Sequence, residues 1–244
     1  MSNVLVHLAP APVVARVATA TAIARAGGAR AWLERDVEMA GWLAARGAAV
    51  VAPADELPPG PHEADGFALT FWRLVHPEAD RPSAARSGRK LRELHEWLDG
   101  FPGALEPLSS VLDETRALID RCGLGSLREP LRAARGGIER LALPARALHG
   151  DAHAGNLLRT DTGLVWTDFE DSCAGPVEWD LACLVFGSTD GPAALGAYGF
   201  GGDPSGLEPF VEARALQVAA WTALMAEDRP QLRPRLAQRL QRWA

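Results

Sequence analysis

Two short polar segments carry the residues with the clearest chemical potential. The first reads His149-Gly150-Asp151-Ala152-His153-Ala154-Gly155-Asn156, and the second reads Asp168-Phe169-Glu170-Asp171. Apolar residues precede both segments, as expected where strands end. Loops at strand ends present side chains from a rigid scaffold, which is how binding and catalytic groups are commonly positioned. The sequence therefore predicts that Asp151, Asn156 and Asp168 face one site.

These residue types, in this order, are those that phosphoryl transfer needs. One group orients the acceptor hydroxyl, oxygen ligands hold Mg²⁺, and positive charge neutralises the phosphates. An Asp, an Asn five positions later and a second Asp after a hairpin match the kinase arrangement of catalytic Asp and two metal ligands. Mg²⁺ prefers hard oxygen ligands. Asp151 is thus the candidate base, and Asn156 and Asp168 are the candidate metal ligands.

Simpler interpretations of the same residues stay open. Asp and Asn in loops are often turn formers, because both bond to their own backbone. We interpret His149 and His153 as loop-positioning residues, and the alternative for His153 is a metal ligand beside Asp151 and Asp168. A metal-dependent phosphoesterase is a further possible class, although such sites typically need more His and Asp ligands.

The elements that must position these residues differ between the two parts of the chain. Short β-branched runs predict strands, and apolar residues recurring at three and four predict a helix that ends at Gly47. The elements predicted in the first part are strands at 4–8, 13–17, 48–51 and 67–72, a helix at 32–44, a loop at 53–65 and a polar connector at 76–82.

Beyond residue 83 long helical periods dominate, interrupted by one β-rich island that contains a hairpin. The elements predicted there are helices at 83–98, 109–121 and 124–141, the island at 146–168, and helical structure from Val177 onward. The chain is therefore predicted to be a two-lobed α+β protein, with a small β-rich N-lobe at 1–76 and a large helical C-lobe at 77–244.

The combined motif resembles the aminoglycoside phosphotransferase and choline kinase family, whose members have a protein-kinase-like fold. Its hallmark is a His-Gly-Asp-x-His-x-x-Asn loop followed by an Asp-Phe-Glu-like segment. The resemblance implies that Asp151 is the catalytic base, that Asn156 and Asp168 bind magnesium, and that Asp180 braces the catalytic loop. It also implies a hinge that contacts adenine at Phe71, Trp72 and Arg73.

Two features depart from the family pattern. The family's first strand and Gly-rich loop have no counterpart, since Ser2-Asn3-Val4 resembles the exit of that loop; a misplaced start site and a shortened lobe both remain open. Arg16 stands where the family has a phosphate-anchoring Lys, and Arg is not a neutral replacement. Its expected carboxylate partner is Asp36, with Glu34 and Glu38 as competitors; these helix acids otherwise form a solvated face.

We therefore expect an ATP-dependent phosphotransferase, using ATP or another nucleoside triphosphate with Mg²⁺, that acts on a small-molecule hydroxyl. The alternative is a catalytically silent kinase-like protein that binds a nucleotide or metabolite. Acids on the C-terminal helices are candidates for contacts to a cationic acceptor, although such acids usually face solvent. They are Asp190, Asp203, Glu208 and Glu212.

The charge, the apolar runs and the cysteines of the sequence limit which partners and which cellular compartment we expect. The formal net charge of −6 and the lack of a dense basic run argue against a nucleic-acid partner. No secretory leader is evident, and no apolar run approaches the roughly 20 residues of a membrane span. Three widely spaced cysteines without a CxxC pair predict reduced thiols in a cytoplasmic protein. The oligomeric state stays open.

Overall fold

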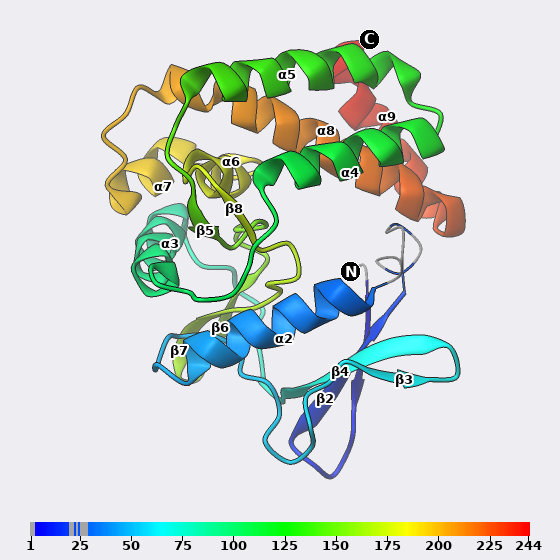
Figure 1. Ribbon diagram of the computed structural model, residues 1–244, viewed down its shortest axis with the longest axis vertical. Coiled ribbons are helices and arrows are strands. Elements are labelled where there is room, and N and C mark those ends of the chain that lie inside the picture. Colours follow the sequence, from blue (N-terminus) through cyan, green and yellow to red (C-terminus); the bar gives the residue numbers. More distant parts are fainter. Residues whose placement is uncertain (1–2, 20–21, 23, 25–28) are drawn as a thin grey trace.

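The computed structural model describes residues 3–19, 22, 24 and 29–244, which form two lobes (Figure 1). The N-lobe contains a four-stranded antiparallel sheet in the order β1-β2-β4-β3. Helix α2 lies between this sheet and the helical lobe (Figure 1). The elements of the N-lobe are β1 (Asn3–His7), β2 (Val13–Ala18), α2 (Arg30–Ala44), β3 (His62–Ala64) and β4 (Phe67–Arg73). Met1 and Ser2, where the sequence predicts the exit of a Gly-rich loop, lie outside the described residues.

The C-lobe is mainly helical and contains two short antiparallel ladders, β5-β8 and β6-β7. Helices α4, α5, α8 and α9 gather on the side of the lobe that faces away from the N-lobe sheet (Figure 1). The helices of the C-lobe are α3 (Ala84–Leu98), α4 (Leu108–Arg121), η1 (Gly125–Leu127), α5 (Arg128–Leu141), α6 (Glu178–Val185), α7 (Gly191–Tyr198), η2 (Pro204–Leu207), α8 (Glu208–Asp228), η3 (Pro230–Leu232), α9 (Arg233–Leu240) and η4 (Gln241–Trp243). Its strands are β5 (Arg146–Leu148), β6 (Leu157–Thr160), β7 (Gly163–Trp166) and β8 (Cys173–Gly175).

Two apolar clusters hold the molecule together. One lies among the C-lobe helices and includes Leu118, Trp179 and Phe210. The other crosses between the lobes, because Leu43 of α2 belongs to the same cluster as Trp166 of β7. Burial of apolar surface is the main favourable term in folding, so this shared cluster fixes α2 against the hairpin that carries the site.

The two-lobed α+β architecture predicted from the sequence is confirmed. Predicted strands and helices coincide with β1, β2, β4, α2, α3, α4 and α5 to within a few residues, and the hairpin of the island is β6-β7. The predicted polar connector at 76–82 contains no helix or strand. Ser83, at the start of α3, caps it by accepting a hydrogen bond from Arg86 N at 3.4 Å. The division at residue 76 remains a prediction.

Two predictions in the N-lobe were wrong. The predicted strand at 48–51 forms only an isolated parallel bridge between Val50 and Trp166, because its main chain bonds to a single residue of β7. The predicted loop at 53–65 contains β3 near its end. Asp65 and Gly66 both have positive φ, the conformation that a tight Asp-Gly hairpin turn requires, and they join β3 to β4.

Sequence reasoning also missed β8, because three residues are too few for a periodic signal. This strand pairs with β5 through Leu148 and Cys173. The pairing brings the end of β5, where the His-Gly-Asp loop begins, next to the chain that follows the second polar segment. The two polar segments are therefore held together at both ends, by β5-β8 and by β6-β7.

Candidate active site

The loop between β5 and β6 carries the first polar segment and is anchored by the start of α6. The Asp180 carboxylate accepts hydrogen bonds from His149 N at 2.8 Å and from Gly150 N at 2.9 Å. Trp179 Nε1 donates to Gly150 O at 2.8 Å. His95 of α3 lies with its Nε2 2.9 Å from Asp180 Oδ2. The bracing role that the resemblance implied for Asp180 therefore has a direct geometric basis.

Gly150 is required by both its conformation and its surroundings. Its φ is +84°, which disfavours any residue with a Cβ. A Cβ at this position would lie 1.8 Å from Asp171 O, closer than atoms can approach. The His-Gly-Asp loop thus packs directly against the end of the second polar segment.

The two histidines of the loop have different environments. His149 is fully buried and packs against Trp166 and Phe169, with ring centroids 5.2 and 4.7 Å away. Its Nε2 lies 3.2 Å from Thr167 O, so this nitrogen donates, and Nδ1 accepts from Asp151 N at 3.3 Å. His149 therefore ties Asp151 to the second polar segment.

His153 lies at the edge of the loop. Its Nδ1 accepts from Gly155 N at 2.8 Å, and its Nε2 lies 3.5 Å from Asp151 Oδ2. With Nδ1 already engaged, the ring is held by its own loop. This geometry supports a positioning role for His153.

Asp151 and Asn156 lie together. Asn156 Nδ2 donates to Asp151 O at 3.0 Å and to Asp151 Oδ2 at 3.1 Å. The side-chain nitrogen Nδ2 is thus fully engaged, which leaves the side-chain oxygen Oδ1 of Asn156 as the atom available to a ligand. Thr167 N donates to the main-chain oxygen of Asn156 at 3.0 Å, so Asn156 is tied to the residue that precedes Asp168.

The charge of Asp151 is balanced by Arg214 of α8, which sequence reasoning missed. Arg214 Nη2 forms a close ion pair with Asp151 Oδ1, and Arg214 Nη1 donates to Gln217 at 2.5 Å. Burial raises the pKa of Asp151, but the Arg214 cation and then His153 and His149 outweigh that effect and hold the pKa well below its usual value. Asp151 is therefore an ionised carboxylate with a fixed orientation.

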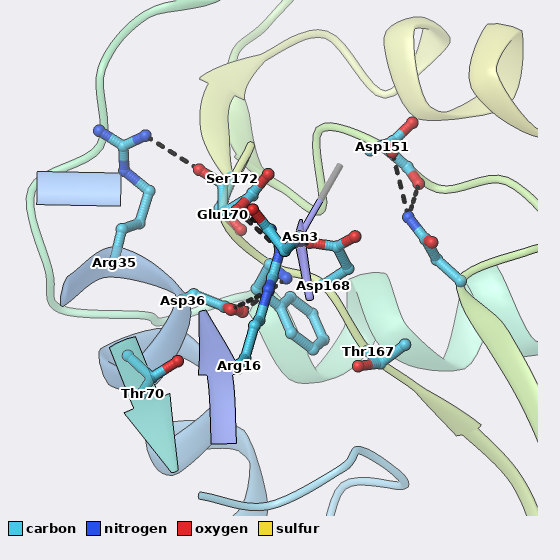
Figure 2. A network of polar contacts seen from close by, with 12 residues as sticks. Asn3, Arg16, Arg35, Asp36, Thr70, Asp151, Thr167, Asp168, Glu170 and Ser172 are labelled. Atoms are coloured by element: carbon cyan, nitrogen blue, oxygen red, sulfur yellow. Dashed lines mark hydrogen bonds and ion pairs between the residues drawn. The ribbon is translucent and has the colours of Figure 1, made fainter. Parts of the chain in front are cut away.

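Asp168 follows β7 in a left-handed conformation, with φ +71°. Asp adopts this region more readily than most residues, and such backbone strain is concentrated at functional sites. In the view of Figure 2, the Asp168 carboxylate lies between Asp151 and the residues around Arg16. Asp168 Oδ1 accepts from Arg16 Nη2 at 2.6 Å.

Arg16 stands at the centre of a buried ionic group, here called the Arg16 cluster, made of Arg16, Asp36, Asp168 and Glu170 (Figure 2). Arg16 Nη1 pairs closely with Asp36, and Arg16 Nη2 also donates to Glu170 at 2.7 Å. Asp36 has no exposed surface, so the solvated-face interpretation is wrong for it; Glu34 pairs instead with Arg30.

The Arg16 cluster carries more negative than positive charge. One guanidinium faces three carboxylates, which gives a net charge of −2 when all are ionised. Burial, partly offset by Arg16, and the nearby carboxylate of Asp168 raise the pKa of Asp36 to about 6. Phe169 N donates to Asp36 at 2.8 Å, so the cluster also ties helix α2 to the segment that holds Asp168.

The predicted hinge residues lie at the end of β4. Trp72 is buried and its Nε1 donates to Thr70 at 2.8 Å, while Arg73 forms an exposed ion pair with Asp55. Phe71 N donates to Pro59 O at 2.8 Å, and Arg73 N donates to Ala52 O at 3.0 Å. These two main-chain donors are already used inside the protein.

The structure thus brings together Asp151, Asn156, Asp168, His149, His153 and Asp180, and it joins Arg16 and Asp36 to them through Asp168. Among the described residues, Phe71, Trp72 and Arg73 form no hydrogen bond or ion pair with this group. The residues that sequence reasoning missed are Arg214, Glu170 as a partner of Arg16, and His95. Arg214 is the only Lys or Arg in the apolar segment 208–228, and this could have indicated a buried ion pair, because a buried charge needs a partner.

We expect Asp180→Ala to lower the free energy of unfolding by about 3 kcal/mol. The change leaves two buried amides without an acceptor, and each unsatisfied group costs about 1–3 kcal/mol. Urea denaturation at neutral pH measures the effect. Asp190→Ala is the matched control: it removes only an exposed helix cap at α7, worth about 1 kcal/mol. Equal losses in the two variants would contradict the bracing role.

Comparisons with known proteins agree with the fold. A model of the phosphotransferase enzyme family matches residues 2–213. This match spans most of the chain, and the protein belongs to that family. No curated protein matches the chain significantly in sequence.

Solved structures of low sequence identity share the fold. A choline/ethanolamine kinase family protein from Mesorhizobium loti is 19% identical with a TM-score of 0.65, covering 100% of this chain and 84% of that one. A choline kinase from Streptococcus pneumoniae is 15% identical with a TM-score of 0.69, covering 99% and 88%. An amicoumacin kinase, solved in complex with AMP-PNP, Ca²⁺ and Ami, is 14% identical with a TM-score of 0.70, covering 98% and 86%. The protein is therefore a kinase-like phosphotransferase by fold and family. Among the described residues, no helix has the length and apolar character of a membrane span.

Proposed function

We propose that the protein transfers the γ-phosphoryl group of ATP, or of another nucleoside triphosphate, to a hydroxyl of a small molecule. The observation that most supports this is the group formed by Asp151, Asn156 and Asp168. Asp151 and Asn156 share a hydrogen bond of 3.1 Å, and Asn156 is joined through Thr167 to the segment that carries Asp168. Phosphoryl transfer depends mainly on such positioning and on electrostatics.

The proposed reaction transfers one phosphoryl group and one proton, and Asp151 receives the proton. The acceptor oxygen forms a bond to the γ-phosphorus, the bond from that phosphorus to the bridging oxygen breaks, and the nucleoside diphosphate leaves. The hydroxyl proton passes to Asp151 and then to solvent. Because Arg214 holds Asp151 ionised and fixed, the carboxylate accepts the hydroxyl's hydrogen bond and aims its oxygen at the phosphorus.

The donor set fits Mg²⁺. The side-chain oxygen Oδ1 of Asn156 and the carboxylate of Asp168 are hard oxygen ligands of the kind that Mg²⁺ prefers. Asn156 and Asp168 would hold the metal, which when bound neutralises phosphate charge. Asp168 Oδ1 is engaged by Arg16, so the metal would take the other carboxylate oxygen or share this one.

The nucleotide would extend from this metal site toward the end of β4. We assign its adenine end to the neighbourhood of Phe71, Trp72 and Arg73. Because Phe71 N, Arg73 N and Leu74 N are already bonded inside the protein, direct main-chain donation to the base would begin at Val75. Arg16, which lies on β2 beside β4, would face the phosphates.

A cytoplasmic location is proposed on the state of the cysteines. All three, Cys122, Cys173 and Cys183, are free thiols. Burial raises the pKa of Cys173 and Cys183, which makes both poor nucleophiles. Free, unreactive thiols are typical of reducing compartments.

The engagement of Arg16 favours a second candidate, a silent kinase-like protein that binds a nucleotide or metabolite. Three carboxylates already occupy the guanidinium, and Arg differs from Lys in its hydrogen-bonding geometry. An Arg held in this way would contact phosphates only if Asp168 or Glu170 released it. Binding without transfer is the property that separates this candidate from the enzyme.

The test is acceptor-dependent formation of nucleoside diphosphate and of a phosphorylated product, with Mg²⁺ and either ATP or GTP. The acceptors are amino alcohols, an aminoglycoside and hydroxy acids, and the product is identified by mass. Thermal unfolding with and without nucleotide measures binding, because a ligand of the folded state raises apparent stability. We expect both transfer and a stability increase. A stability increase without transfer to any acceptor supports the silent protein. The absence of both transfer and a stability increase would overturn the proposal.

A further inference from the structure

The acids that the sequence offered for a cationic acceptor are used elsewhere in the C-lobe. Asp190 and Asp203 cap α7 and η2 by accepting main-chain hydrogen bonds of 3.1 and 2.9 Å. Glu212 pairs with Arg242 at 2.6 Å. Glu208 and Glu212 line a hollow of about 1020 Å³ between α5, α7 and α8, and none of the described residues that line it belongs to the His-Gly-Asp loop. These acids therefore give no support for a cationic acceptor at Asp151.

The charged side chain in direct contact with Asp151 is a cation. Arg214 Nη2 forms a close ion pair with Asp151 Oδ1. Arg214 Nη1 donates to Gln217 Oε1 at 2.5 Å, and both residues lie on the same face of α8, three positions apart. The Arg214 side chain is only 8% exposed, so salt and water screen its charge weakly. A guanidinium stays protonated in proteins, so this positive charge is permanent as well as fixed in place.

Asp151 can still accept the hydroxyl of an acceptor. Its Oδ1 is engaged by Arg214, and its Oδ2 accepts from Asn156 Nδ2 at 3.1 Å. A carboxylate has about four acceptor positions, so at least one remains for the hydroxyl. Because two hydrogen bonds of about 3 Å would share one carboxylate, the bound hydroxyl would lie within roughly 7 Å of the guanidinium. Arg214 therefore acts on whatever group flanks that hydroxyl.

The charge balance at Asp151 works against a positively charged acceptor. The carboxylate of Asp151 and the guanidinium of Arg214 cancel one another, so the pair offers no net negative charge. An ammonium group next to the reacting hydroxyl would meet the cation at close range. Like charges placed together are a common means of excluding wrong partners. An uncharged substituent in the same place meets no such repulsion.

We propose that Arg214 determines acceptor specificity by repelling positive charge, and that the acceptor is a hydroxyl compound without an ammonium group beside its reacting hydroxyl. This inference rests on the proposed phosphotransferase function and narrows its substrate class. Arg214 acts through its charge and takes no proton. The bonds formed and broken at phosphorus are those given above.

The first test compares two acceptors of nearly the same shape, with Mg·ATP as the donor. They are choline and its neutral analogue, in which a carbon atom replaces the quaternary nitrogen. We expect kcat/KM to be at least about 10-fold higher for the neutral analogue, because only choline brings a second cation to the site. An equal or higher kcat/KM for choline would overturn the specificity while leaving the phosphotransferase function in place.

Variants of Arg214 separate charge from structural damage. Arg214→Gln should abolish or reverse the preference, because Asp151 then keeps an uncompensated negative charge, whereas damage alone would lower both values alike. Arg214→Lys keeps the charge and should keep the preference. Arg242→Gln is the matched control, because Arg242 is a half-exposed cation already paired with Glu212, and it should leave the ratio unchanged. An unaltered ratio in Arg214→Gln would remove the role of Arg214.

A second measurement does not depend on turnover. Choline chloride is the probe, and its effect on thermal unfolding is compared with that of sodium chloride at the same concentration. We expect no difference between the salts in the unmodified protein, and extra stabilisation by choline in Arg214→Gln, where Asp151 is free to bind a cation. Specific stabilisation of the unmodified protein by choline, or equal responses in the two proteins, would overturn the inference, whether or not any acceptor is phosphorylated. If Arg214→Gln does not fold, the acceptor comparison in the unmodified protein still decides.

Discussion

Asp151→Asn is expected to lower kcat for phosphoryl transfer by about 10²- to 10⁴-fold, the usual contribution of a positioned acid–base group. The amide keeps the size of the side chain but cannot take the proton of the acceptor hydroxyl. It also leaves Arg214 without its anionic partner. Steady-state kinetics with saturating acceptor measures the loss.

Two controls separate this effect from damage to the fold. The dissociation constant of a non-hydrolysable ATP analogue should change little, because the proposed reaction has Asp151 contact the acceptor hydroxyl and not the nucleotide. Asp161→Asn, in the exposed turn between β6 and β7, should retain full activity. A variant at Asp151 that transfers phosphate as fast as the unmodified protein would remove this residue as the base.

Arg16→Met is expected to lower the free energy of unfolding by about 3–5 kcal/mol, because it removes the guanidinium that pairs with the fully buried carboxylate of Asp36. Asp36 has no exposed surface and Glu170 is 5% exposed, so water cannot replace the guanidinium at either side chain. Urea denaturation at neutral pH measures the change.

Arg16→Lys should recover part of this loss, since an ammonium keeps the charge but reaches fewer of the three carboxylates. Arg30→Met is the matched control on the surface. Its pair with Glu34 is more than half exposed on both sides, and such pairs contribute about 0–1 kcal/mol. Similar losses at Arg16 and Arg30 would contradict a buried ionic cluster.

The fold was predictable where periodicity is strong and local. Helix α2 and strand β4 follow their residue patterns closely. The segment at 48–51 has the composition of a strand, but whether it forms one depends on a partner, and within the described part of the chain it bridges Trp166 alone. Strand β3 was hidden because its three residues, His62, Glu63 and Ala64, include no β-branched or large apolar residue, and its signal lies in the following Asp65-Gly66 turn.

The candidate site was predictable where its residues are close in sequence. Asp151 and Asn156 share one loop, and Asp168 follows the adjoining hairpin. Arg214 lies far along the chain from Asp151, on a helix whose single cation indicates that a partner exists but not which residue it is. Such a partner is set by tertiary packing, and the sequence offered no spacing from which to infer it.

The pairing of Arg16 with Asp36 in the N-lobe was predictable only in part. Asp36 was expected as the partner of Arg16 because of its place on the helix, but a solvated helix face has the same sequence pattern. The choice depends on how α2 packs, which places Asp36 against Phe169 N. Glu170 joins the Arg16 cluster only because the hairpin turns its segment toward β2.

The most direct test of the central claim is a crystal structure with a non-hydrolysable ATP analogue and Mn²⁺, used as an anomalous scatterer in place of Mg²⁺. We predict an anomalous peak between Oδ1 of Asn156 and the Asp168 carboxylate. Its distance to each ligand oxygen should be roughly the 2.1 Å expected for a small divalent cation. The γ-phosphate should face Asp151. A peak bound by other residues, or a nucleotide whose γ-phosphate points away from Asp151, would contradict the account.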